Sequence, residues 1–255
     1  MKKILSSVLV ICMLLGALSL TSCKKKINED DTKLKLGVGI HTYIEKATDA
    51  DGELTGKGQA ATTIAAVLLD ENGKILKCKL DCAENLIEYT SEGKFVAADE
   101  FKTKYELGDD YGMKKLAGAK KEWFEQADAF CSVAVGKSAA DIDLLVADGK
   151  KGNSDVINAG CTVDVSEFVY AIKKAIDSAE KTTASAQDDL SLSVTTKLIG
   201  KDASQDAEGY SRLNMAIRAV ALSQKDKKET ASKDISETVE FTFDAKGIST
   251  LEIKK

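Results

Sequence analysis

Two short stretches in which apolar and polar residues alternate constrain the fold of this chain more than any other feature. The stretches are Leu34–Ile40 and Leu190–Val194, and a period of two residues is typical of a β-strand with one buried face. Each stretch is followed by a polar segment rich in Asp, Lys and Gly, and then by an apolar run. The polar segments are residues 46–58 and 200–209, and the apolar runs are residues 62–69 and 213–222. The sequence therefore predicts two antiparallel β meanders of similar design.

The two meanders also align residue by residue. The aligned positions are 65–67 with 218–220 and Asp81 with Asp234, both 153 residues apart, and Gly93 with Gly247, 154 residues apart. One inserted loop residue explains why the offset between the copies changes from 153 to 154 residues. Because the second copy stops at Lys255, we expect a partial repeat made of strands only. The alternative is a chance likeness between two meanders that both alternate and both turn at Asp-Gly.

The residues between the two meanders have helical periodicity. Three helices are predicted. The first carries the apolar stripe Trp123, Ala127, Phe130 and Ala134, and the second runs over residues 139 to about 147 after a Ser138–Asp141 capping box. The third is capped by Asp164–Glu167 and carries the stripe Phe168, Ile172, Ala175, Ile176 and Ala179 down to Glu180. The fold class is thus α+β, antiparallel β meanders with a helical insert. We predict a domain over residues 34–180, a linker over 181–189 and a β-rich partial repeat over 190–255.

Cysteine and histidine usage predicts no metal site. Cys78 and Cys82 alternate with polar residues on a predicted strand, so their thiols lie about 13 Å apart, too far for a disulfide or a shared metal. We interpret them as small core residues. His41 is the only histidine, which excludes a histidine-based metal cluster.

The first 23 residues resemble the signal peptide and lipobox of bacterial lipoproteins. Lys2 and Lys3 precede an apolar run from Ile4 to Leu20, and the run closes with Leu20-Thr21-Ser22-Cys23. The resemblance implies cleavage before Cys23 and a diacylglyceryl group on its thiol, with residues 1–22 as the signal peptide and 23–33 as a tether. Two or more acyl chains anchor a protein stably to a membrane. We expect a lipid-anchored protein on the extracytoplasmic face of the cell membrane; a stop-transfer helix is the alternative reading.

The charge of the mature chain argues against nucleic acid as a partner. Removing residues 1–22 takes away two lysines and leaves 34 basic against 41 acidic residues, so the formal charge falls from -5 to -7. A protein that binds nucleic acid needs a basic face to neutralise phosphates.

Four segments occur in an order that resembles a known cofactor-binding family. Residues 65–75 read as a strand hairpin, 106–113 as a Gly-containing loop, Trp123 as part of a helix, and 157–165 as a short motif that opens a second amphipathic helix. This order is similar to that of FMN-binding domains in electron-transport subunits and flavin-carrying surface lipoproteins. The resemblance covers about residues 62–179 and implies an FMN-binding-domain-like fold with FMN as cofactor.

The flavin-attachment motif of that family is altered in this chain. Thr162 matches the residue that carries FMN through its phosphate and Gly160 matches the glycine, but Cys161 and Ala159 replace the family residues and Asp155 is displaced by one position. These departures favour noncovalent flavin over covalent attachment at Thr162. A phosphate at the N-H groups that open the following helix would compete with Asp164, the predicted cap.

The segment 102–113 is the second candidate surface. Tyr111, Gly112 and Met113, together with Lys102, offer the aromatic face and polar donors that an isoalloxazine ring needs; a solvated loop is the alternative. Because no nucleophile and base pair is evident, we expect a flavin binder or electron carrier with a redox partner rather than an enzyme. The alternative is a structural or ligand-binding surface lipoprotein that has lost its flavin.

Overall fold

The computed structural model describes residues 33–254 apart from 97–100, 148 and 245–247, and gives no side-chain positions after residue 244. The predicted signal peptide and the lipidation site Cys23 lie outside the described residues. Among the described residues, no helix has the length and apolar character needed to cross a membrane.

The first half of the chain forms a five-stranded antiparallel sheet. Its strands are β1 (Lys35–Thr48), β2 (Gly56–Leu69), β3 (Ile75–Tyr89), β4 (Phe95–Val96) and β5 (Glu180–Lys181), in the order β4-β3-β2-β1-β5. The centre of β2 is buried on both faces, which explains why residues 62–69 read as a continuous apolar run rather than as an alternation.

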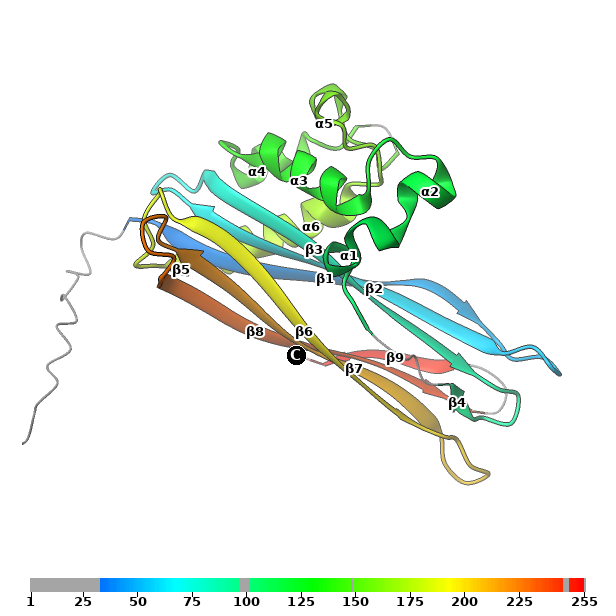
Figure 1. Cartoon of the computed structure of the whole chain (residues 1–255). Coiled ribbons are helices and arrows are strands. Elements are labelled where there is room, and N and C mark those ends of the chain that lie inside the picture. Colours follow the sequence, from blue (N-terminus) through cyan, green and yellow to red (C-terminus); the bar gives the residue numbers. More distant parts are fainter. Residues whose placement is uncertain (1–32, 97–100, 148, 245–247, 255) are drawn as a thin grey trace, which may run out of the picture.

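Helices cover one face of this sheet (Figure 1). They are α1 (Lys104–Leu107), the 3-10 turn η2 (Gly108–Tyr111), α2 (Met113–Ala117), α3 (Trp123–Ala134), α4 (Ala139–Asp143), α5 (Ser154–Ala159) and α6 (Ser166–Asp177). The predicted Trp and Phe stripe of α3 is buried against the sheet. The α+β class is therefore confirmed.

Four details of the helical layer differ from the prediction. The third predicted helix, α6, ends at Asp177 rather than at Glu180, which lies in β5. The second predicted helix ends at Asp143 rather than near residue 147, because Val146 and Ala147 bond to the backbone of residues 151–152 instead. Val165, not Asp164, is the N-cap of α6, although Asp164 Oδ1 accepts from the Ser166 amide at 2.9 Å. The predicted loop over residues 102–113 is folded into α1 and η2.

The second half of the chain forms a separate four-stranded antiparallel sheet. Its strands are β6 (Asp189–Lys201), β7 (Gly209–Leu222), β8 (Glu229–Phe243) and β9 (Ile248–Lys254), in that order. The segment predicted as a linker between the halves starts in β5, which pairs with β1, and it buries Thr182, Ala184 and Asp188.

The strands of the second sheet repeat those of the first. β2 and β7 have equal length, as have β3 and β8, and isolated bridges at Asp51–Leu54 and Ser204–Ala207 close the first turn of each copy. The extra residue lies in the turn between the second and third strands, so β8 is offset from β3 by 154 residues. Asp234 therefore corresponds to Leu80, and its predicted alignment with Asp81 is wrong.

Equivalent faces of the two sheets pack against each other and share one core. Side chains of β1, β2 and β3 meet those of β6, β7 and β8. Tyr89 and Phe243, which occupy equivalent positions in the two copies, stack with ring centroids 4.9 Å apart and planes at 23°. The molecule thus has three layers, with helices on the first sheet and the first sheet on the second (Figure 1).

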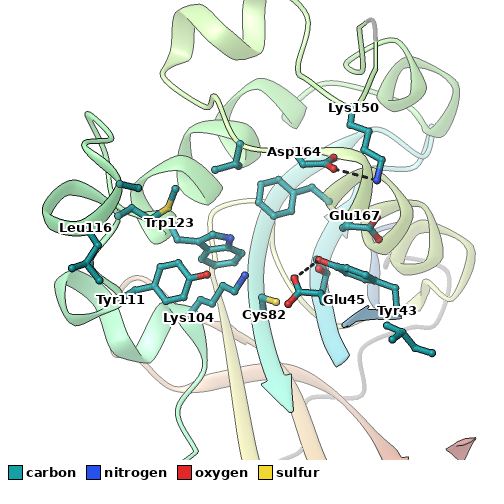
Figure 2. Close-up of a pocket in the computed structure, with 17 residues that line it drawn as sticks. Tyr43, Glu45, Cys82, Lys104, Tyr111, Leu116, Trp123, Lys150, Asp164 and Glu167 are labelled. Atoms are coloured by element: carbon teal, nitrogen blue, oxygen red, sulfur yellow. Dashed lines mark hydrogen bonds and ion pairs between the residues drawn. The ribbon is translucent and has the colours of Figure 1, made fainter. Parts of the chain in front are cut away.

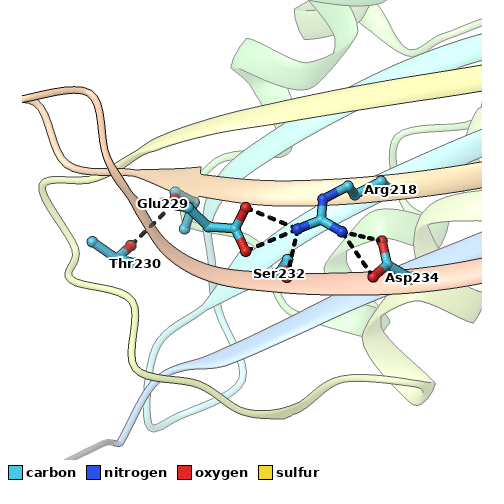
Figure 3. Close-up of polar contacts among 6 residues, drawn as sticks. Arg218, Glu229, Thr230, Ser232 and Asp234 are labelled. Atoms are coloured by element: carbon cyan, nitrogen blue, oxygen red, sulfur yellow. Dashed lines mark hydrogen bonds and ion pairs between the residues drawn. The ribbon is translucent and has the colours of Figure 1, made fainter. Parts of the chain in front are cut away.

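The outer face of the second sheet is polar where the first sheet carries helices. Arg218 takes the place that Ala65 occupies in the first sheet, and its guanidinium binds Glu229 at 2.8 Å, Asp234 at 3.0 Å and Ser232 at 3.3 Å (Figure 3). Such exposed ion pairs contribute little to stability. They keep this face polar where no helix covers it.

Candidate functional site

A cavity of about 800 Å³ lies between the helical layer and the first sheet. Its volume falls in the range of small-molecule and cofactor sites. The lining residues come from β1, β2, β3, the α1–α2 segment, α3, α6 and the connections that precede α5 and α6: Tyr43, Ile44, Glu45, Thr63, Cys82, Lys104, Tyr111, Gly112, Met113, Leu116, Ala117, Trp123, Lys150, Val163, Asp164, Glu167 and Phe168. Figure 2 shows Tyr111 and Trp123 on one side and Tyr43 with Glu45 on the other. We call this space the main cavity.

Lys104 places a buried cation in the wall of the main cavity. Thr103 and Glu106 form a capping box that starts α1 at this lysine, and Lys104 Nζ lies 2.6 Å from Glu84 Oε1. The ammonium also lies 5.1 Å from the Tyr111 ring centroid and 5.7 Å from that of Trp123. Burial alone lowers the pKa of Lys104, but the neighbouring Glu84 carboxylate raises it above its usual value, so the side chain stays charged.

Cys82 lies in the cavity wall beside this lysine as a thiol rather than a thiolate. Burial raises the pKa of Cys82 to about 12, against the opposing charge of Lys104. Because the thiolate is the nucleophile, this cysteine is chemically inert at neutral pH. It contributes a small apolar surface.

The opposite wall carries a carboxylate–imidazole pair. Glu167 Oε2 lies 2.7 Å from His41 Nε2. Burial raises the pKa of Glu167, with a smaller contribution from Asp164, while burial and the charge of Lys174 lower the pKa of His41. Both shifts favour the uncharged forms of the two groups, so burial opposes a full ion pair at this short distance.

The structure brings three of the four residues predicted in segment 102–113 to the main cavity, whereas Lys102 is exposed and does not line it. Tyr111, Gly112 and Met113 all line it, and Gly112 has a left-handed backbone with φ 80°. The buried carboxylate of Glu122 fixes this segment, because it accepts from the amide of Met113 at 2.7 Å and from that of Lys114 at 3.0 Å. The predicted alternative of a solvated loop does not hold for these residues.

The predicted attachment motif lies beside the main cavity rather than in it. Gly160 and Thr162 line a second cavity of about 440 Å³ together with Lys120 and Lys121. Cys161 is fully buried, and burial raises its pKa to about 11. Only the residues after Thr162, Val163 and Asp164, reach the main cavity.

Gln126 occupies the position where the resemblance places a phosphate. Its Oε1 accepts from the amide and the hydroxyl of Thr162, at 2.8 and 3.1 Å, and from the amide of Val163 at 3.2 Å. Its Nε2 contacts Met113 Sδ at 3.8 Å. One buried amide thus satisfies the donors that a phosphate would need and connects the second cavity to the wall of the main one.

Most of the polar groups of the site could not be recognised from the sequence. Lys104, Glu167 and Gln126 stand on different elements, and no spacing in the chain links them. The capping box at Thr103 and Glu106 was the signal that could have located Lys104, because it turns residues 103–106 into a helical turn against the sheet.

Asp81 on β3, which is buried outside the main cavity, makes stability depend on pH. Burial raises the pKa of Asp81 to about 6 from 3.8, although the Thr103 side chain and the amides of Cys82 and Tyr105 donate to it. A raised folded-state pKa means stabilisation that is complete below pH 3.8 and is lost as pH rises through 6. We expect the unfolding free energy of the wild type to fall between pH 4 and 7 by on the order of 2 kcal/mol more than that of Asp81→Asn. Urea denaturation of both proteins at each pH measures this difference. A difference between the two proteins that does not vary with pH would contradict this assignment.

Comparison with known proteins gives one partial relative. A Desulfitobacterium hafniense protein named chlorophenol reductase is 37% identical over 94 residues, which cover 32% of this chain and 28% of that protein. This chain therefore spans less than a third of that relative. No family model matches the chain, and no solved structure matches it significantly.

Proposed function

We propose that this chain is a lipid-anchored extracytoplasmic flavin binder that carries electrons, with FMN held noncovalently in the main cavity. The observation that carries the proposal is the composition of the cavity wall. Trp123, Tyr111 and Phe168 supply planar and apolar surface, and Lys104 adds one fixed positive charge. When bound, the flavin would supply the redox chemistry, and the protein would hold and tune it.

The residues of the cavity fit an isoalloxazine ring better than they fit a sugar or a peptide. Aromatic side chains on facing walls suit a flat conjugated ring, and a cation at the edge of the ring stabilises negative charge that builds up on reduction. Lys150 at the rim, 3.6 Å from Asp164, offers a charge for the phosphate. The Glu167–His41 pair offers a group that can exchange a proton with solvent.

Covalent attachment at Thr162 is not part of this proposal. The Thr162 hydroxyl donates to Gln126 and faces the second cavity. A phosphoester at this oxygen would require the buried Gln126 side chain to leave its three donors, which costs free energy unless the phosphate replaces every one of them.

The partial relative agrees with a redox role, because the name of that protein is a reductase. The match covers a minor part of both chains. We therefore transfer only the general class, electron transfer, and not the substrate that the name states.

A structural or ligand-binding lipoprotein without flavin is the second candidate. Gln126 favours it, because the donors at Thr162 are satisfied by the protein itself. Absorbance near about 450 nm in protein purified from its native host distinguishes the two candidates. Colourless protein that also fails to bind added FMN would exclude the flavin proposal.

Replacing Lys104 tests the placement of the flavin. We expect Lys104→Met to weaken FMN binding about tenfold, because a buried charge-assisted contact is lost. Quenching of flavin fluorescence on titration measures the affinity. In Lys104→Met the Glu84 carboxylate loses its partner. The Lys104→Met/Glu84→Gln double variant removes that carboxylate and keeps the fold, and it should bind FMN as weakly as the single variant.

Lys121→Met is the matched control. Lys121 lines the second cavity and donates to the Ala159 carbonyl at 2.9 Å, so its loss should leave FMN affinity unchanged. Equal weakening by both substitutions would place the ligand elsewhere.

A further inference from the structure

Two cysteines that are far apart in the sequence meet between the first sheet and the helical layer. Cys78 Sγ on β3 and Cys131 Sγ on α3 are 3.2 Å apart, although the residues are separated by 53 positions. Both side chains are almost completely buried, at 8% and 6% exposure. We infer that Cys78 and Cys131 form a disulfide that joins β3 to α3 in the exported protein.

The surrounding contacts hold the two elements in register at this point. Lys79, the neighbour of Cys78, lies 3.6 Å from Asp128 on α3, and Asp128 also accepts from the Tyr105 hydroxyl at 3.0 Å. Asp128 stands one helical turn before Cys131. The sulfurs need to move only roughly 1 Å closer to reach bonding distance.

The other cysteines are not alternatives for this bond. Cys82 lies on the same strand as Cys78, too far along it for a disulfide between the two. Cys161 lies before α6, and its sulfur is hydrogen-bonded to the backbone amide of Val163. A metal is not the explanation either, because the described residues contain no group of three His, Cys, Asp or Glu side chains that could hold one.

Bond formation is a two-electron oxidation. Both S–H bonds break, one S–S bond forms, and two protons and two electrons leave the pair. A disulfide of an exchange catalyst, or oxidised glutathione, accepts them and becomes two thiols. Burial disfavours the Cys131 thiolate, so we expect the bond to form while the chain folds rather than afterwards. Such bonds persist outside the cytoplasm, where the lipobox resemblance places this chain.

Peptide mapping of the full chain tests the inference. The protein is exported with its own leader and refolded in a glutathione redox buffer. It is then unfolded without reductant in the presence of an alkylating agent, which blocks every free thiol, and digested. We expect one linked peptide pair containing Cys78 and Cys131, with Cys82 and Cys161 alkylated. Alkylation of all four thiols, or a linkage that involves Cys82 or Cys161, would overturn the inference.

Thermal unfolding gives a second readout that does not depend on flavin. Reductant should lower the Tm of the wild type by roughly 5–10 °C, because the bond closes a long loop. Cys161→Ser, which removes a buried cysteine outside the pair, should keep this sensitivity, and Cys131→Ser should lose it. If Cys131→Ser fails to fold, the peptide map of the wild type still decides the question.

Discussion

Phe241→Ala is expected to destabilise the whole protein by about 3–5 kcal/mol, because it leaves a large cavity in the core that the two sheets share. Phe241 on β8 has no exposed surface and lies among side chains of both sheets. Its loss should therefore weaken the first sheet as well as the second. Denaturant unfolding followed by two probes measures this effect.

Trp123 makes the coupling between the layers measurable. It is the only tryptophan of the chain and packs in the helical layer on the far side of the first sheet, so its fluorescence reports that layer alone. Far-UV circular dichroism reports the secondary structure of both sheets together with the helices. In Phe241→Ala both transitions should move together to lower denaturant.

Ile199→Ala is the control for this prediction. Ile199 on β6 is 36% exposed, and its truncation should cost less than about 1 kcal/mol. If Phe241→Ala shifts only the circular dichroism and leaves the Trp123 transition in place, the second sheet unfolds independently and the shared core is not the source of stability.

Gly39→Ala is expected to cost about 2–3 kcal/mol, because β1 and α6 are in direct backbone contact. A Cβ at Gly39 would lie 2.2 Å from the Ala171 carbonyl oxygen and from the Ala175 nitrogen of α6. Neither backbone atom can move without shifting the helix. Since the first turn of α6 carries Glu167 and Phe168, this variant should also weaken ligand binding in the main cavity.

Gly73→Ala separates this steric effect from backbone strain. Gly73 has φ +76°, but an added Cβ would meet no atom within 4 Å, so only the left-handed conformation is penalised, by about 1 kcal/mol. Equal losses of unfolding free energy in Gly39→Ala and Gly73→Ala would show that α6 is not in direct backbone contact with Gly39.

Much of the fold could be predicted from the sequence, because local patterns determine strands and helices. The alternation around Leu36 and Leu190 predicts β1 and β6, and the apolar spacing from Trp123 to Ala134 predicts α3. The boundaries near Asp143 and Asp164 were less accurate, since the backbone groups there bond to partners elsewhere in the chain.

Only part of the candidate site could be predicted from the sequence, because its other residues depend on partners elsewhere in the chain. Tyr111 and Met113 stood out as an aromatic and apolar pair in a glycine-containing segment, and both line the main cavity. Gln126 carries no local signal, and the capping box around Lys104 predicts a helical turn but not a buried cation. The importance of both residues depends on Glu84 and on Thr162, which lie on other elements.

By itself the sequence determined the α+β class, the repeated strand pattern and the positions of the main helices, because hydrophobic periodicity acts within a few residues of chain. Only the tertiary structure decided that equivalent faces of the two meanders pack together, that Gln126 takes the donors at Thr162, and that Cys78 meets Cys131 rather than Cys82. Each of these depends on contacts between residues far apart in the chain, and side-chain periodicity contains no information on which distant surfaces meet.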